Sequence, residues 1–355
     1  MRDRTKEIVK DGFGCLVNNA AAIRGAKAGP LWLTIVMFIL SVFLPVIPIF
    51  VSNINTKGAS FLNSYSYGLE RYVTQVALDL QADGYEFGVD TNHLLTITKD
   101  GSEINFDDYR TNGEIQPLAT YVNSVTGEYD FMVYISNDAK SAEKKATYSV
   151  INNTYYDVTT TDIGTYDKNN ASAFYRPSYI LLYKDSVYVA VNKGSKNVKS
   201  SLGGDYKTFK ADNAYLAKLL TVKDKEGNTI APSMTTASYV DGVYKNFKSF
   251  LNKSYETLRI RNSFATAGIY LAIFFGLTLV MGLLMWILTR GKNNPNNYYS
   301  LWLTMKIQAR LGLAPALITL VVGFFLTSYA ALIYIVTIGL RAMWISMKEL
   351  RPIAQ

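Results

Sequence analysis

The chain has 355 residues, of which 49% are hydrophobic, and a formal net charge of +8 at pH 7. It contains one cysteine and one histidine, which excludes an internal disulfide and a metal centre built from several Cys or His ligands. The sequence has neither a P-loop motif nor a G-x-S-x-G motif, which excludes ATP hydrolysis by a P-loop and a nucleophile elbow.

The first thirty residues are basic, and a long apolar segment follows them. Apolar residues recur among the charged ones of 5–24, which favours either a helix along the inner membrane surface or a disordered tail. Residues 31–52 carry no charge and are long enough to cross a hydrocarbon core, which needs about 20 apolar residues as a helix. We predict a cytoplasmic amphipathic tail at 1–30 and a first span at 31–52. This apolar run exceeds that of a cleavable signal peptide, so we expect it to stay as an anchor.

Residues 53–263 are more polar and are predicted to form one α+β domain. Apolar residues recur at spacings of three and four in 61–80 and 239–258, which predicts a helix near each end. Between them the period changes to two, which is typical of strands. Strands are expected at 85–89, 94–98, 131–135, 179–183 and 186–191, a last hairpin across 219–230, and loops with short edge strands through 137–175. The domain is thus predicted as a mostly antiparallel sheet between two helices that continue into the membrane.

Two further apolar stretches follow the polar domain. Residues 264–289 are predicted to form the second span, with a cytoplasmic loop at 290–304. The last stretch is too long for one ordinary crossing, and Thr327 and Ser328 interrupt it. We predict spans at 305–326 and 329–347, joined by a tight turn, and a cytoplasmic tail at 348–355. A single tilted helix is the alternative.

Basic residues concentrate beside the apolar stretches. Residues 1–30 hold six Lys and Arg against three acids, 290–311 hold four without an acid, and 341–355 hold three against one. Cytoplasmic loops carry such an excess, so all three segments are predicted to be cytoplasmic. The predicted fold class is therefore a membrane protein of four transmembrane α-helices, with a large α+β extracytoplasmic domain between helices 1 and 2. We expect it in a bacterial cell membrane.

The polar domain offers few residues for chemistry. His93 precedes an apolar strand and is expected to be a surface residue at the start of that strand. The acids Asp107 and Asp108 lack the spacing of a calcium loop and are expected in solvated loops. We therefore predict no catalytic residue, no metal and no cofactor, and a protein that is not an enzyme.

Small residues recur within the predicted spans, at Gly276, Gly282, Gly323 and Ala330. Such residues let helices approach closely in lipid, where packing drives helix association. These positions are candidates for packing against a partner protein. Packing within this chain is the equally weighted alternative.

Several short motifs occur in a recognisable order. An Asp100-Gly101 turn is followed by a strand ending in an acid (Phe131 to Asp138), by I-L-L-Y-K-D-S-V-Y-V at Ile180–Val189, and by L-A-P-A-L-I-T-L at Leu313–Leu320. With this order the chain resembles a bacterial family of integral membrane proteins of unknown mechanism, whose members often accompany maltose and maltodextrin import systems. The polar domain is longer than is usual in that family, notably at 137–175. The resemblance implies no catalytic residues.

Two functions from different classes follow as hypotheses. The first is a non-catalytic accessory or regulatory membrane protein of a maltodextrin-type ABC importer. Its partners would be the lipid bilayer and the membrane subunits or substrate-binding protein of the importer. The alternative is an extracytoplasmic sensor whose tyrosines line a small-molecule pocket. No nucleic-acid partner is expected, because the basic residues flank the spans and show no sign of clustering on one folded face.

Overall fold

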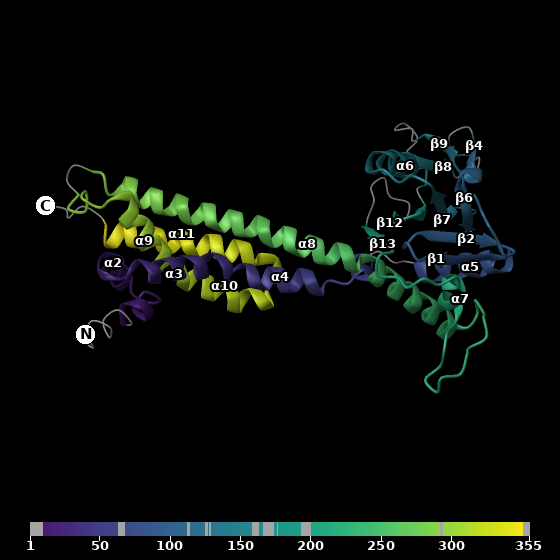
Figure 1. The fold of residues 1–355 in the computed structure, drawn as a ribbon, viewed down its shortest axis with the longest axis horizontal. Coiled ribbons are helices and arrows are strands. Elements are labelled where there is room, and N and C mark those ends of the chain that lie inside the picture. Colours follow the sequence, from purple (N-terminus) through teal and green to yellow (C-terminus); the bar gives the residue numbers. More distant parts are fainter. Residues whose placement is uncertain are drawn as a thin grey trace. The chain divides into compact units, whose positions relative to one another are not determined.

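The computed structural model describes residues 10–62, 68–111, 114–124, 127, 129–157, 163–165, 174–175, 177–192, 200–291 and 294–350. The chain divides into two compact units. The first, called the helical unit, comprises Met1–Asn55 and Ile260–Gln355. The second, called the β unit, comprises Thr56–Arg259. Figure 1 shows the elements of each unit.

The helical unit consists of α-helices and one short 3-10 turn. Its elements are α2 (Asn19–Ala28), α3 (Leu31–Phe43), α4 (Val46–Asn55), the C-terminal part of α8 (Ala237–Leu288), α9 (Leu301–Leu311), α10 (Leu313–Phe325), η4 (Thr327–Tyr329) and α11 (Ala330–Lys348). In the described part of the chain, four helices are long and apolar enough to cross a membrane: Leu31–Asn55, Ala237–Leu288, Leu301–Phe325 and Thr327–Lys348. The sequence predicted the same number of spans.

The last apolar stretch forms two helices. At Leu326 the backbone leaves the helical conformation, with φ −124° and ψ 56°, and η4 follows. α10 and α11 then pack against each other. The alternative of one long tilted helix is therefore wrong.

The helix limits differ from the predicted span limits 264–289 and 305–326. α8 already begins at Ala237, because the amphipathic stripe of 239–258 and the apolar segment after it form one continuous helix. α9 begins at Leu301, because the Ser300 side chain accepts a hydrogen bond from the backbone N–H of Leu303 at 3.1 Å and so caps the helix.

Two apolar clusters hold the helical unit together. One contains Phe274 of α8 and Tyr334 of α11, whose ring centroids lie 4.6 Å apart. The other contains Met285 of α8, Ile307 of α9 and Ile345 of α11. Many other large apolar side chains of this unit are exposed, among them Ile39, Phe43, Ile269, Ile273, Val280, Val321, Phe325, Leu332 and Leu340.

The strands that the structure describes, β1 to β13, all lie in the β unit, which also contains three further helices. Its elements are η1 (Gly58–Phe61), α5 (Leu69–Ala82), β1 (Tyr85–Val89), β2 (Leu95–Lys99), β3 (Ser102–Glu103), η2 (Phe106–Tyr109), β4 (Arg110–Thr111), β5 (Glu114–Ile115), β6 (Pro117–Val122), β7 (Tyr129–Ser136), α6 (Ser141–Asn153), β8 (Thr154–Asp157), β9 (Ile163–Thr165), β10 (Phe174–Tyr175), β11 (Ser178–Tyr183), β12 (Ser186–Val191), β13 (Ser200–Asp205), α7 (Tyr215–Leu220) and the start of α8. The expected helix at 61–80 corresponds to α5, and part of its range lies outside the described residues.

The central sheet has five strands in the order β13-β12-β11-β7-β6. β7 and β11 pair in parallel, and the other neighbours pair antiparallel. A separate antiparallel sheet contains β1, β2 and β3. The predicted strand at 85–89 is β1, with the same limits.

Both faces of the central sheet are buried, and the two-residue period of the strands divides the side chains between them. Phe131, Val133 and Ile135 of β7 join the large core with α5, α7 and α8. Met132 and Tyr134 point to the other face and join a second core with Ile151 of α6. Figure 1 shows α6 on one side of the sheet and α5 and α7 on the other. Each such fully buried Val, Ile or Phe contributes about 1.5–3 kcal/mol to stability.

The prediction of loops with short edge strands through 137–175 is confirmed by the short strands β8, β9 and β10. It is wrong for residues 141–153, which form α6. The helix buries Thr147 and Ile151, which are four residues apart and lie on one face. Thr147 is polar and donates a hydrogen bond to Asp138. An apolar pattern could not reveal this face, because one of its contacts is a hydrogen bond.

The predicted hairpin across 219–230 is wrong in its first strand. Leu219 and Leu220 end α7 and are helical. The loop part of the prediction is present, because Ile230 N–H donates to Val222 O at 2.8 Å and Lys223 pairs with Thr229. Hydrogen bonds with Glu86 and Asn246, which are distant in the sequence, stabilise α7.

Candidate functional site

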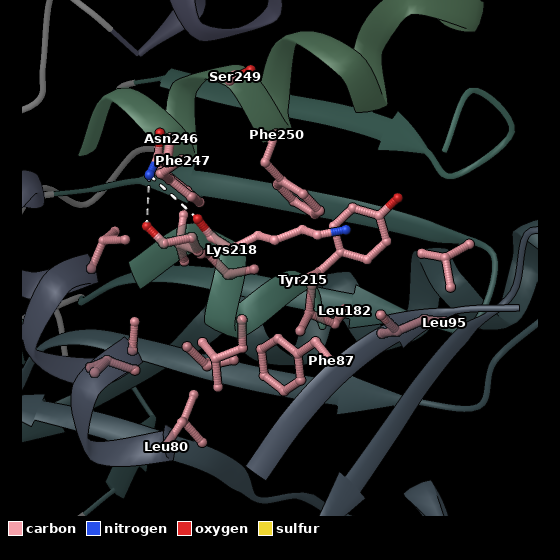
Figure 2. A pocket seen from close by; sticks show the side chains of 18 of the residues that line it. Leu80, Phe87, Leu95, Leu182, Tyr215, Lys218, Asn246, Phe247, Ser249 and Phe250 are labelled. Atoms are coloured by element: carbon pink, nitrogen blue, oxygen red, sulfur yellow. Dashed lines mark hydrogen bonds between the residues drawn. The ribbon is translucent and has the colours of Figure 1, made fainter. Parts of the chain in front are cut away.

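The main candidate site is a cavity of about 310 Å³ inside the β unit. Its walls are almost entirely apolar and are formed by α5, the two sheets, α7 and α8. Figure 2 shows Leu80, Phe87, Leu95 and Leu182 among the side chains that line it. The other apolar lining residues are Val73, Val76, Ala77, Val89, Phe131, Val133, Ile180, Phe209, Leu216, Leu219, Phe247 and Phe250.

The inner wall of the cavity is one face of the central sheet. Phe131 and Val133 of β7 line it, and so do Ile180 and Leu182 of β11. In the parallel register Ile180 lies beside Val133, so these alternate positions share a face. Because alternate residues of β7 and β11 are apolar and point to the same face, this wall is continuous and apolar.

The outer wall is α7, which is held at both ends by side chains from other elements. At its N-terminus the Glu86 carboxylate accepts hydrogen bonds from the backbone N–H groups of Leu216 at 2.7 Å and Ala217 at 3.2 Å. At its C-terminus the Asn246 amide donates to the carbonyls of Leu219 and Thr221, both at 3.0 Å. These bonds satisfy end groups that a helix leaves unpaired, and they fix α7 against β1 and α8.

The exposed lining residues, Lys218 and Ser249, mark the mouth of the cavity, and aromatic side chains lie next to it. The Phe209 ring lies 5.3 Å from Tyr215 and 5.2 Å from Phe250, in both cases edge to face. Lys253 Nζ lies 4.7 Å from the centre of the Phe209 ring, and Lys218 Nζ lies 5.4 Å from that of Tyr215. Figure 2 shows the Lys218 side chain extending toward Tyr215. Both lysines are within the usual range of a cation–π contact.

Two lysines of the cavity lining lie near this mouth. Lys218 forms an ion pair with Asp212. Partial burial lowers the pKa of Lys253, and the nearby charges of Lys210 and Lys218 lower it further, against a smaller opposing effect of the Glu256 carboxylate. The lining residues that carry a formal charge are Lys218 and Lys253. The arrangement is therefore an apolar chamber with cations at its opening.

A second polar group in the β unit centres on Asp138, the acid that follows β7. Arg110 and Ser136 each donate to its carboxylate at 2.8 Å, and Thr147 of α6 donates as well. Burial by itself raises the pKa of Asp138, but the hydrogen bonds from Thr147 and Ser136 and the Arg110 charge outweigh it and hold this pKa below its usual value. Its partners come from the protein, so the group ties α6 to β7 and is not a ligand site.

The expected sensor pocket differs in composition from the observed cavity. The prediction placed tyrosines in the pocket, yet Tyr215 is the tyrosine among the lining residues. Tyr134, Tyr179 and Tyr183 lie in the core on the opposite face of the sheet. Phe209, Phe250 and Lys253 were missed, because their helical or loop context gives no local indication of a cavity.

His93 and the acids of the polar domain are engaged in local structure. His93 has φ 60°, and its Nδ1 lies 3.1 Å from the carbonyl oxygen of Phe209. Asp107 accepts a hydrogen bond from Asn137 at 3.1 Å. Over the residues that the structure describes, no cluster of three His, Cys, Asp or Glu side chains could hold a metal ion.

The four small residues predicted for partner packing have different surroundings. A Cβ added at Gly282 would lie 2.5 Å from Met305 Sδ, and one at Gly323 would lie 3.0 Å from Pro48 Cγ. Ala330 is fully buried beside Gly323. A Cβ at Gly276 would meet no atom of the described chain within 4 Å. Three of the four therefore lie in packing within this chain, and Gly276 faces open space.

Comparisons of the chain with protein families, with curated proteins and with solved structures gave no match.

Proposed function

We propose that this chain is a non-catalytic membrane protein whose β unit binds a small apolar ligand outside the cytoplasm of a bacterial cell. The observation that carries the proposal is the cavity of about 310 Å³ in the core of the β unit. Small-molecule sites are concave, mostly apolar and usually about 300–1,000 Å³ in volume. A close-packed core contains few voids larger than a water molecule, so a cavity of this size favours a ligand site.

Membrane insertion is supported by the four long apolar helices and by the side chains at their ends. Trp286 and Trp344 lie near the C-terminal ends of α8 and α11, and Trp32 and Trp302 near the N-terminal ends of α3 and α9. Arg290 lies over the Trp286 ring at 4.6 Å, and Lys348 over the Trp344 ring at 6.0 Å. Aromatic residues with neighbouring cations favour a cytoplasmic membrane surface at these ends.

The orientation follows as part of the proposal. The N-terminus, 290–304 and the C-terminus lie in the cytoplasm, and the α+β domain lies outside, between the first and second spans. In the Cys15→Ser background, an impermeant thiol reagent should label Ile353→Cys only after permeabilisation. Labelling of this position in intact cells would contradict the orientation.

The continuous helix α8 supports a sensing role. Phe247 and Phe250 of α8 line the cavity, and the apolar segment of the same helix begins at Phe264. A ligand that fills the cavity would contact Phe247 and Phe250 of α8 directly. Its binding would therefore favour the position of α8 that makes these contacts. We propose that ligand occupancy is transmitted through α8.

Ligand binding can be measured with a label at the cavity mouth. Ser249 is exposed and lines the cavity. In a Cys15→Ser background, Ser249→Cys is labelled with a polarity-sensitive dye and the full chain is placed in lipid nanodiscs. Serine at position 15 retains the hydrogen bond that Cys15 Sγ donates to Gly12 O at 2.9 Å. Addition of 1-dodecanol should shift the emission of the dye and saturate.

Two variants of α5 provide the control for this titration. Ala77 is buried and lines the cavity, whereas Ala82 is exposed on the same helix and does not line it. Ala77→Leu should fill part of the cavity and abolish the response, and Ala82→Leu should leave it unchanged. An absent response in the unsubstituted chain, or an equal response in the Ala77→Leu variant, would contradict the proposed function.

An accessory role is favoured by one further observation. On α8, Gly268 and Gly276 both face open space within the described chain, and Ala272 lies between them at a spacing of four. Such a stripe suits close approach of another helix in lipid. The partner that we propose is a membrane subunit of a maltodextrin-type ABC importer, on the basis of the sequence resemblance. Co-purification from mild detergent should lose this subunit in the Gly276→Leu variant.

A further inference from the structure

The cavity has the volume of a medium-length aliphatic chain. A cavity of about 150 Å³ accommodates benzene in another protein, so by proportion a volume near 310 Å³ accommodates roughly twelve carbon atoms. The inner wall, formed by Phe131, Val133, Ile180 and Leu182, has no charged side chain. The buried part of the ligand must therefore be apolar, since an unpaired polar group there would lose its hydrogen bonds to water.

The charge at the mouth selects the other end of the ligand. The lining residues include two lysines and no acid, and both lysines belong to the elements of the opening, α7 and α8. Lys218 is already paired with Asp212. A ligand with a negative head group would place it beside these cations while its chain fills the chamber.

Lys253 is the cation that is available to a ligand. Across the described residues it forms no ion pair, and its ammonium group lies over the Phe209 ring. Its backbone is fixed, because Thr208 donates a hydrogen bond to Lys253 O at 2.7 Å. Besides burial, repulsion from neighbouring positive charges lowers the pKa of Lys253. An anion at this position would offset that repulsion.

From this geometry we infer that the cavity binds an amphipathic anion, with a single aliphatic chain in the chamber and a carboxylate or phosphate head group held by Lys253. The inference rests on the proposed ligand-binding function and adds the chemical class of the ligand. Charge-assisted hydrogen bonds from an ammonium to such a head group are stronger than neutral ones. Lys253 is thus the residue that determines specificity.

The test compares three ligands with the same chain and different heads: dodecanoate, dodecyl phosphate and 1-dodecanol. The labelled full chain in nanodiscs is titrated with each, and the free ligand concentration is measured at equilibrium. At least one of the two anions should bind about tenfold more tightly than the alcohol, as expected for a hydrogen bond to a charged group. The anion that binds more tightly identifies the head group.

Three lysine variants separate charge from packing. Lys253→Met retains the aliphatic stem and should weaken anion binding about tenfold while leaving 1-dodecanol unchanged. Lys253→Arg retains the charge and should preserve most of the anion affinity. Lys245→Met removes the same charge from an exposed position of α8 that does not line the cavity, and should have no effect.

Two results would overturn the inference in distinguishable ways. If all three ligands bind equally and Lys253→Met changes none of them, the ligand class is wrong while the proposed binding function stands. If none of the ligands shifts the emission, both the inference and the proposed function fail.

Discussion

In the β unit the large apolar side chains lie inside, whereas in the helical unit many of them lie outside. Phe131, Ile135 and Val189 are at most 1% exposed. Phe325 is 84% exposed, and Ile269 and Val321 are each 60% exposed. Exposed apolar surface on this scale favours a lipid environment, because contact between apolar side chains and water is energetically unfavourable. Large apolar side chains therefore build a closed core in the β unit, whereas in the helical unit many of them form an exposed apolar surface.

Asp138 in the β unit and Gln308 in the helical unit differ in whether their buried polar atoms have hydrogen-bond partners. In the β unit the Asp138 carboxylate has three side-chain donors. In the helical unit the Gln308 side chain is fully buried, and neither its amide nitrogen nor its oxygen has a hydrogen-bond partner in the part of the chain that the structure describes. The hydrogen bonds of Asp138 therefore stabilise the β unit, whereas the unpaired atoms of Gln308 destabilise the helical unit.

The largest expected effect concerns the Asp138 group. Asp138→Ala removes the acceptor of three hydrogen bonds and leaves Arg110 without its ion pair, which should cost the β unit about 2–3 kcal/mol. Hydrogen exchange of residues 129–136 in the full chain measures this loss. Asp107→Ala, at an exposed acid, is the control and should change exchange little. Equal exchange in the two variants would contradict the account.

The same group predicts a pH dependence with a definite sign. Because folding lowers the pKa of Asp138, its contribution is complete above the unfolded-state pKa of about 4 and is lost as pH falls through the lower folded-state value. The stability difference between the unsubstituted chain and Asp138→Asn should therefore shrink below about pH 4. A difference that grows on acidification would contradict this origin.

The next effect distinguishes internal packing from the open surface of α8. Gly323→Leu must displace Pro48 and Ala330, which should cost the helical unit about 1–3 kcal/mol, whereas Gly276→Leu has room for its side chain. Tryptophan fluorescence during heating follows this unit alone, because all four tryptophans lie in it. Equal melting temperatures for the two variants would contradict the close packing of Gly323 against Pro48 and Ala330.

A smaller effect is expected at Gln308. Gln308→Met preserves the length of the side chain and removes two buried polar atoms without partners, so the helical unit should gain about 1 kcal/mol. The same tryptophan melt should show a higher transition temperature. A loss of stability would mean that Gln308 has a partner outside the described residues.

The sequence predicts those parts of the fold that depend on local patterns. Uninterrupted apolar length predicts the four helices, and a period of two predicts β1, β11 and β12. It fails where a distant side chain decides the structure. α7 is helical because Glu86 and Asn246 satisfy its ends, and α6 packs partly through the hydrogen bond from Thr147 to Asp138.

The cavity could not be predicted from sequence for a related reason. It is a space between α5, the sheets, α7 and α8, and each of its lining residues also suits an ordinary core. Lys253 looks like a solvent-facing lysine of an amphipathic helix. Its role becomes visible only when Phe209 is placed under its ammonium group and the cavity opens beside it.

The most direct test of the central claim is to determine which unit holds an apolar ligand. A dodecyl diazirine is photolysed with the full chain in nanodiscs, with and without excess 1-dodecanol, and the labelled peptides are mapped. Labelling of Val73–Leu80, Phe131–Val133 and Ile180–Leu182 should be saturable, competed by the alcohol and lost in Ala77→Leu. Labelling confined to the helical unit, without competition, would contradict the claim that the β unit binds a ligand.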